Sequence, residues 1–173
     1  MPQLKLAGTA LGMLALQQLL AVIFPDGFRP DALMIFALAL GLRSGSTSSL
    51  VFAFALGLLV DLLSGSPPGT YALLRGTACA LTRIAGRTLY LRAPVPWAAY
   101  AAAYQGIDFV LLGAITLILL PEGGAGFGAL MARAPGAMLA TGLLAAPLAV
   151  LLDRWGIVSL SSPTVEATGR PLL

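Results

Sequence analysis

TSSLVFAFALGLLVDLLSGSPPG, residues 47–69, joins an apolar stretch of helical length to a turn rich in serine, glycine and proline. The hydrocarbon core of a bilayer is about 30 Å thick, and a helix needs roughly 20 residues to cross it. Lipid offers no partner to backbone N–H and C=O groups, and a helix satisfies all of them within one continuous apolar stretch. Thr47 to Leu63 is therefore predicted to form a membrane helix that ends near Ser64.

Further stretches of the same kind lie on both sides of this one. Clusters of glycine, proline and serine separate them, as expected of turns, and no gap is long enough for a second domain. We expect an all-α membrane protein, a six-transmembrane-helix bundle over residues 1–155 with a short cytoplasmic tail over residues 156–173. The expected helices are Leu6 to Phe24, Asp31 to Leu42, Thr47 to Leu63, Thr70 to Tyr90, Val95 to Leu120 and Gly128 to Leu152.

The composition favours a membrane protein and argues against catalysis. Hydrophobic residues make up 58% of the chain and charged residues only 10%, whereas a soluble domain carries about 25% charged residues. With no histidine and one cysteine, the chain cannot build a Cys/His zinc site, a Ser-His-Asp triad or an internal disulfide. Basic residues are spread singly, so no nucleic-acid surface is expected. We predict a protein that is not an enzyme and needs no cofactor or metal.

The second expected helix is short, and its path decides the topology. The apolar residues Ala32 to Leu42 would cover only about 16 Å at the helical rise of 1.5 Å per residue, which suits a short span or a re-entrant segment. If all six stretches cross, seven of the ten basic residues fall inside, as the positive-inside rule favours. Both termini are therefore predicted to be cytoplasmic. Inside lie Lys5, Arg43, Arg83, Arg87, Arg92, Arg154 and Arg170; outside lie Arg29, Arg75 and Arg133.

Small residues recur at intervals of four along several of the expected helices. Gly8 and Gly12 form such a stripe in the first helix, and Ala53 and Gly57 form another in the third. Flat faces of this kind let helix backbones approach closely in lipid. The stripes either close the bundle or, in the terminal first helix, form a face where a partner helix docks.

Three charged residues are expected deep in the membrane: Arg75, Arg83 and Asp108. An unpaired charge at the bilayer centre costs at least about 2.5 to 3.5 kcal/mol, so each should face the interior or find a partner. Helical rise puts Asp108 within reach of either arginine and matches Asp61 with Arg75 near the outer end. Asp108 is either an interhelical clamp or a proton carrier. The nearby arginines and the lack of a relay favour the clamp.

The segment Pro30 to Leu73 resembles the rod shape-determining protein MreD family. In that family an apolar helix opens with Pro-Asp, and a glycine-containing helix ends in Asp-Leu-Leu-Ser-Gly before a Pro-Gly turn. The matching features here are Pro30-Asp31 with Ala32 to Leu42, then Phe54 to Gly57, then Asp61 to Gly69 with Ala72 and Leu73 beyond.

This resemblance implies a non-catalytic scaffold subunit of the bacterial elongasome in the inner membrane. Such a subunit binds MreC and other elongasome proteins and supports rod-shape maintenance and lateral peptidoglycan synthesis. The resemblance also implies a fold similar to the substrate-binding subunits of energy-coupling-factor transporters. An alternative function is therefore the substrate-binding membrane subunit of a vitamin transporter. Short outer loops with few aromatic side chains favour the scaffold.

The resembling segment also places polar groups at the outer rim. Asp31 can cap the first turn of the second helix, and Asp61, Ser64 and Ser66 gather at the end of the third. The cluster is either a well-capped helical hairpin or a docking surface. We predict partner binding by Asp31, Asp61, Ser64, Ser66, Gly8 and Gly12, an intramembrane network of Arg75, Arg83 and Asp108, and contact with membrane lipids; homo-oligomerisation stays open.

Overall fold

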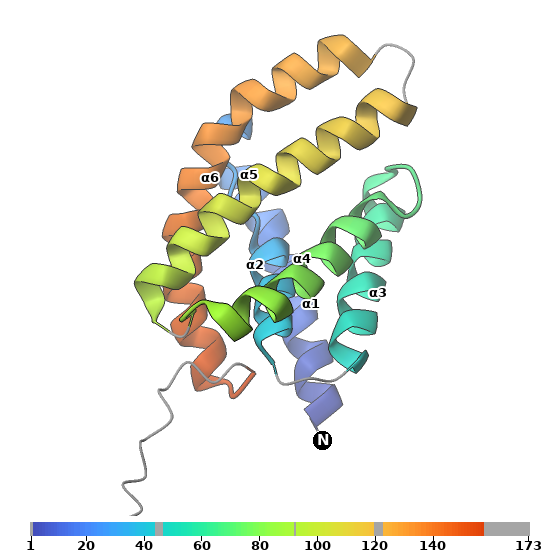
Figure 1. Cartoon of the computed structure of the whole chain (residues 1–173). Helices are drawn as coiled ribbons and strands as arrows, with labels where there is room; N and C mark the ends of the chain where they lie inside the picture. The colour runs from blue at the N-terminus through green and yellow to red at the C-terminus, as the bar shows by residue number, and fades with distance from the viewer. Residues whose placement is uncertain (1, 44–46, 92, 120–122, 158–173) are drawn as a thin grey trace, which may run out of the picture.

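The computed structural model describes residues 2–43, 47–91, 93–119 and 123–157, and these residues form helices without strands (Figure 1). The predicted order of six α-helices is confirmed, with one 3-10 turn between the first two. The tail predicted over residues 156–173 lies outside the described residues from 158 onward. The elements are α1 (Pro2–Ile23), η1 (Asp26–Phe28), α2 (Ala32–Leu42), α3 (Thr47–Ser64), α4 (Thr70–Thr88), α5 (Pro94–Leu119) and α6 (Gly123–Arg154).

Four of these helices are long and apolar enough to cross a membrane: α1, α3, α5 and α6. Large apolar side chains on their outer faces, such as Val22 (85% exposed) and Ile118 (81% exposed), point away from the bundle. So much exposed apolar surface suits a lipid environment and would be costly in water. The helices therefore support a membrane protein.

The other two helices do not meet that description, for different reasons. Helix α2 has only 11 residues, and α4 carries Arg75, Arg83 and Arg87 within its 19 residues. Full crossing by all six helices therefore stays a prediction.

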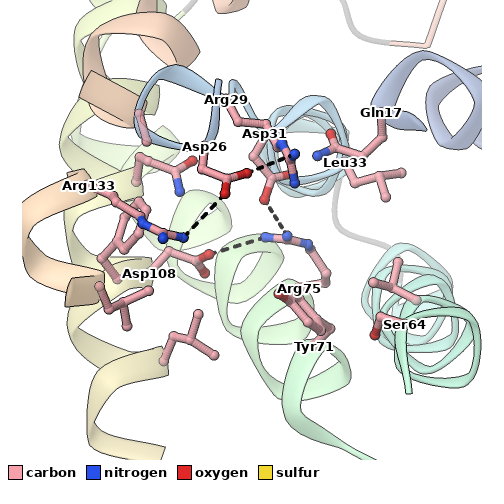
Figure 2. A pocket seen from close by; sticks show the side chains of 16 residues that line it. Gln17, Asp26, Arg29, Asp31, Leu33, Ser64, Tyr71, Arg75, Asp108 and Arg133 are labelled. Atoms are coloured by element: carbon pink, nitrogen blue, oxygen red, sulfur yellow. Dashed lines mark hydrogen bonds and ion pairs between the residues drawn. The ribbon is translucent and has the colours of Figure 1, made fainter. Parts of the chain in front are cut away.

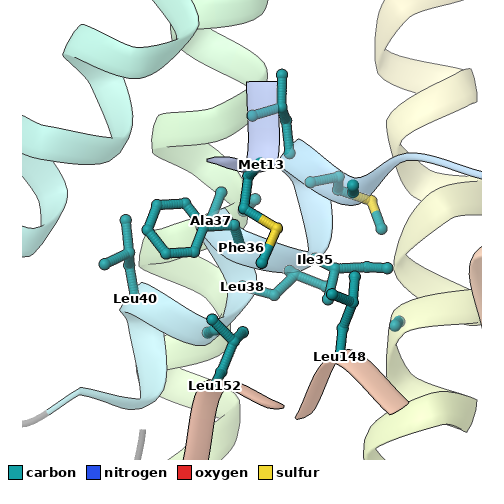
Figure 3. Packing of buried hydrophobic residues seen from close by; sticks show 14 of the residues in the cluster. Met13, Ile35, Phe36, Ala37, Leu38, Leu40, Leu148 and Leu152 are labelled. Carbon is teal, nitrogen blue, oxygen red and sulfur yellow. The ribbon is translucent and has the colours of Figure 1, made fainter. Parts of the chain in front are cut away.

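Helix α2 forms the centre of the bundle. All of its residues from Ala32 to Gly41 are buried, so the helix is enclosed by protein on every side. Figure 3 shows Phe36 and Leu38 of α2 among Met13 of α1 and Leu148 and Leu152 of α6. A helix that is apolar all round is stable in such a position.

Two glycines allow α4 to approach its neighbours closely. A Cβ atom added at Gly41 of α2 would lie 2.5 Å from the carbonyl oxygen of Cys79. One added at Gly57 of α3 would collide with the backbone of Tyr71 and Ala72. Contacts this short exclude any side chain, so small residues set the spacing of α2 and α3 against α4.

The remaining helices pack in two groups around α2. Helices α5 and α6 run along each other, as do α3 and α4, while α1 packs mainly against α2 (Figure 1). The arrangement brings residues of all six α-helices toward one cavity.

Candidate functional site

A cavity of about 280 Å³ lies inside the bundle, and each of the six α-helices contributes to its lining (Figure 2). Its walls combine apolar side chains with three aspartates and three arginines. The aspartates are Asp26, Asp31 and Asp108, and the arginines are Arg29, Arg75 and Arg133. We call this cavity the central pocket.

Arg75 of α4 lies at the base of the central pocket and is only 2% exposed. Its guanidinium contacts the carboxylate of Asp31 directly and lies 3.5 Å from Asp108 Oδ2. It also lies over the Tyr71 ring, 5.6 Å from the centroid. A buried cation needs such compensation, because removing it from water costs several kcal/mol. The three charged residues therefore tie α4 to α5 and to the start of α2.

A second group of charges forms the mouth of the pocket. Asp26 lies 3.0 Å from Arg29 and 3.8 Å from Arg133, and all three side chains are at least 40% exposed. Figure 2 shows Asp26 between Arg29 and Arg133, with an ion pair to each. Exposed ion pairs contribute little to folding stability. The three charged side chains at the mouth can therefore exchange these pairs for contacts with a bound partner.

Asp31 has the capping role predicted for it. Its carboxylate accepts a hydrogen bond from Met34 N at 2.8 Å and so begins α2. Its own backbone N–H donates to Thr141 Oγ1 of α6 at 3.1 Å. One residue thus caps α2, pairs with α4 and is held by α6.

The prediction that Asp61 pairs with Arg75 is wrong. Asp61 is 3% exposed and accepts hydrogen bonds from the backbone N–H groups of Gly69, Tyr71 and Ala72, at 3.0, 2.9 and 3.2 Å. These N–H groups lie at the beginning of α4, where no intrahelical acceptor exists. Arg75 pairs instead with Asp31 and Asp108.

The two serines of the predicted rim lie around Asp61. Ser66 Oγ donates to Asp61 Oδ1 at 2.8 Å, and Ser64 Oγ donates to Ser66 Oγ at 3.0 Å. Ser64 is exposed and also lines the central pocket. The rim is therefore a hydrogen-bonded turn in which Ser64 is open to a partner and Asp61 is not.

The match to known proteins covers all of these pocket residues. A family model described as rod shape-determining protein MreD matches residues 4–149. The chain belongs to the MreD family. No curated protein and no solved structure matches it, so the implied likeness to energy-coupling-factor subunits stays a prediction.

Two of the three residues of the predicted intramembrane network, Arg75 and Asp108, lie together in this MreD-family chain, and the membership of Arg83 stays a prediction. Asp108 pairs with Arg75, while Arg83 lies about two turns further along α4 and does not line the central pocket. An Asp108 carboxylate held by an arginine favours the clamp over the proton carrier.

Three uncharged polar residues that join this network were missed in the sequence. Gln17 Oε1 accepts from Ala32 N at 2.8 Å, and Thr141 Oγ1 donates to Gln105 Oε1 at 3.2 Å. Each residue is an uncharged polar side chain in a mostly apolar helix, which is the signal that could have found it.

Gly8 and Gly12 lie away from the central pocket. Both are exposed on α1, and a Cβ atom added to either would meet no atom within 4 Å. The stripe does not close the described bundle, and its partner-binding role stays a prediction.

Proposed function

We propose that this MreD-family chain is a non-catalytic scaffold of the bacterial elongasome, which binds MreC and supports rod shape and lateral peptidoglycan synthesis. The family match over residues 4–149 carries the proposal, because that family is described as rod shape-determining rather than catalytic. The proposal places the protein in the inner membrane with both termini in the cytoplasm. The vitamin-transporter alternative is not favoured by a match to a shape-determining family.

The central pocket supports a docking role. Its three arginines and three aspartates balance in charge, so a bound segment needs no net charge of its own. Asp108 Oδ1 is buried and has no hydrogen-bond partner among the described residues, which leaves one acceptor for an incoming donor. We infer that MreC docks at the mouth of this pocket and along the rim formed by Asp61, Ser64 and Ser66.

Depletion tests the cellular role. In a rod-shaped host, loss of this protein should give round cells that regain rod shape when it is expressed again. Unchanged shape together with a nutrient auxotrophy would contradict the scaffold and indicate a transporter.

Co-purification of MreC tests the docking surface. Ser64→Trp adds a large ring to the lining of the central pocket and should lower MreC recovery. Asp61→Ala should lower it by loosening the turn that carries Ser64. The matched control is Arg87→Gln, an exposed residue at the end of α4 away from the pocket. Wild-type recovery with both rim variants would remove the rim from the interface, while unchanged recovery with Arg87→Gln shows that the loss is local.

A further inference from the structure

A second hollow lies between the beginning of α1 and the end of α6. It has a volume of about 470 Å³ and is lined by Lys5, Gly8, Thr9 and Gly12 of α1, by Arg154 at the end of α6, and by Trp155. None of these residues lines the central pocket. Figure 1 shows the start of α1 and the end of α6 at the same end of the bundle. We call this hollow the α1–α6 groove.

The groove is open because α1 packs mainly against α2 and leaves its glycine face uncovered. A Cβ atom built at Gly8 or Gly12 would meet no other atom within 4 Å. Thr9 turns its hydroxyl back to the carbonyl of Lys5, at 2.8 Å, so the floor offers little polar surface. A floor of this kind accommodates a hydrocarbon chain.

The two charged residues that line the groove, Lys5 and Arg154, are both positive. Asp153 precedes Arg154 in α6 but is half-buried and does not line the groove. Lys5 and Arg154 are both exposed, and neither side chain forms an ion pair within the described part of the chain. No acidic residue lines the groove, and the first turn of α1 contains none. The positive dipole end of α1 and the negative dipole end of α6 meet here and offset each other, so the attraction for anions comes from the Lys5 and Arg154 side chains. The groove therefore attracts an anion.

Trp155 borders the same end and is 48% exposed. Tryptophan prefers the level of the lipid headgroups, where its ring contacts both apolar and polar groups. Its position puts Lys5 and Arg154 at headgroup depth and the glycine floor at the depth of the acyl chains.

We propose that the α1–α6 groove binds a phospholipid with an anionic headgroup. Its phosphate lies between Lys5 and Arg154, and one acyl chain runs along Gly8 and Gly12. Basic hollows between membrane helices bind such headgroups. A partner helix on the glycine stripe would explain the flat floor but not the two cations, so the charges favour a lipid. This inference does not depend on MreC binding.

Quenching of tryptophan fluorescence by brominated lipids tests the proposal. The chain has two tryptophans, and Trp97 is only 1% exposed. In the Trp97→Phe variant, Trp155 is the sole fluorescent reporter. In the wild-type chain, the buried Trp97 adds a constant background to the fluorescence. The protein is placed in phosphatidylcholine nanodiscs that contain brominated phosphatidylglycerol or, at equal mole fraction, brominated phosphatidylcholine. Brominated phosphatidylglycerol should quench Trp155 more strongly.

Variants separate the groove from general surface charge. Each basic residue near an anionic lipid contributes about 1 kcal/mol, or roughly fivefold in preference, so Lys5→Gln with Arg154→Gln should lower the preference roughly thirtyfold. Gly8→Leu keeps both charges and fills the floor, and it should also lower the preference. Arg87→Gln removes an exposed cation outside the groove and should leave the preference unchanged.

Three results would overturn the proposal. Equal quenching by the two lipids would show no headgroup preference and leave the groove to a partner helix. Full preference in the Lys5→Gln, Arg154→Gln double variant would place the lipid elsewhere. An equal loss with Arg87→Gln would show that the charge of the whole surface, and not the groove, attracts the lipid.

Discussion

Arg75 holds the centre of the molecule because it compensates two carboxylates at once, that of the buried Asp108 and that of the half-buried Asp31. It contacts Asp31 and lies 3.5 Å from Asp108. Arg75→Met removes the cation and leaves both carboxylates, which should lower the free energy of unfolding by about 3–5 kcal/mol. Thermal unfolding in detergent measures this loss. Adding Asp31→Asn and Asp108→Asn should restore part of the stability, because asparagine still caps a helix. A fully stable Arg75→Met variant would contradict the clamp.

Asp61 gives a second prediction for a single residue. Asp61→Asn replaces one acceptor oxygen by an amide that faces backbone donors, and an unsatisfied buried group costs about 1–3 kcal/mol. The apparent melting temperature in detergent should fall accordingly. Ser64→Ala is the control, since it removes only an exposed hydroxyl bonded to Ser66. Equal melting temperatures for Asp61→Asn and Ser64→Ala would show that Asp61 does not hold the start of α4.

The sequence predicted the types of these interactions better than the partners. The capping role of Asp31 could be predicted, because its carboxylate accepts a hydrogen bond from Met34 N, only three residues further along the chain. Asp108 as a partner of Arg75 was one of two alternatives from helical rise, whereas Asp31 as its other partner was not predicted, since Asp31 lies 44 positions away along the chain. Helical rise matched Asp61 with Arg75 by depth alone, but a carboxylate beside the free N–H groups of α4 finds partners closer to it.

At the level of elements, close helix contacts depend on single glycines. Gly57→Ala adds a Cβ atom that collides with the α4 backbone at Tyr71 and Ala72. Overpacking of this kind costs about 1–3 kcal/mol, so the variant should unfold at a lower temperature. Gly12→Ala is the matched control, because an added Cβ meets nothing there. A Gly57→Ala variant as stable as Gly12→Ala would contradict the close α3–α4 contact.

The order of helices could be predicted because turn residues separate the apolar stretches clearly. The enclosure of α2 could not, because hydrophobicity alone does not distinguish a helix surrounded by protein from one surrounded by lipid. Its short length was the only signal, at 11 residues. Helix α4 carries three arginines, and the sequence did not show how its buried Arg75 is compensated. The carboxylate of Asp31 does this, and only the fold brings Asp31 next to Arg75.

For the whole molecule, the two proposed binding regions involve different ends of the bundle. The central pocket and its rim are proposed to meet MreC outside the cytoplasm, and the α1–α6 groove is proposed to hold an anionic lipid at the inner face. Both assignments depend on the prediction that α2 crosses the membrane. A re-entrant α2 would invert every later helix and exchange the sides of Ser64 and Arg87.

Cysteine labelling on intact cells tests that prediction most directly. The native Cys79 is buried, so Cys79→Ala provides a silent background for single cysteines at Lys5, Ser64 and Arg87. A membrane-impermeant maleimide should label Ser64→Cys on intact cells and should label Lys5→Cys and Arg87→Cys only after permeabilisation. Labelling of Arg87→Cys on intact cells, with Ser64→Cys protected, would contradict the six-span bundle and the proposed outward-facing pocket.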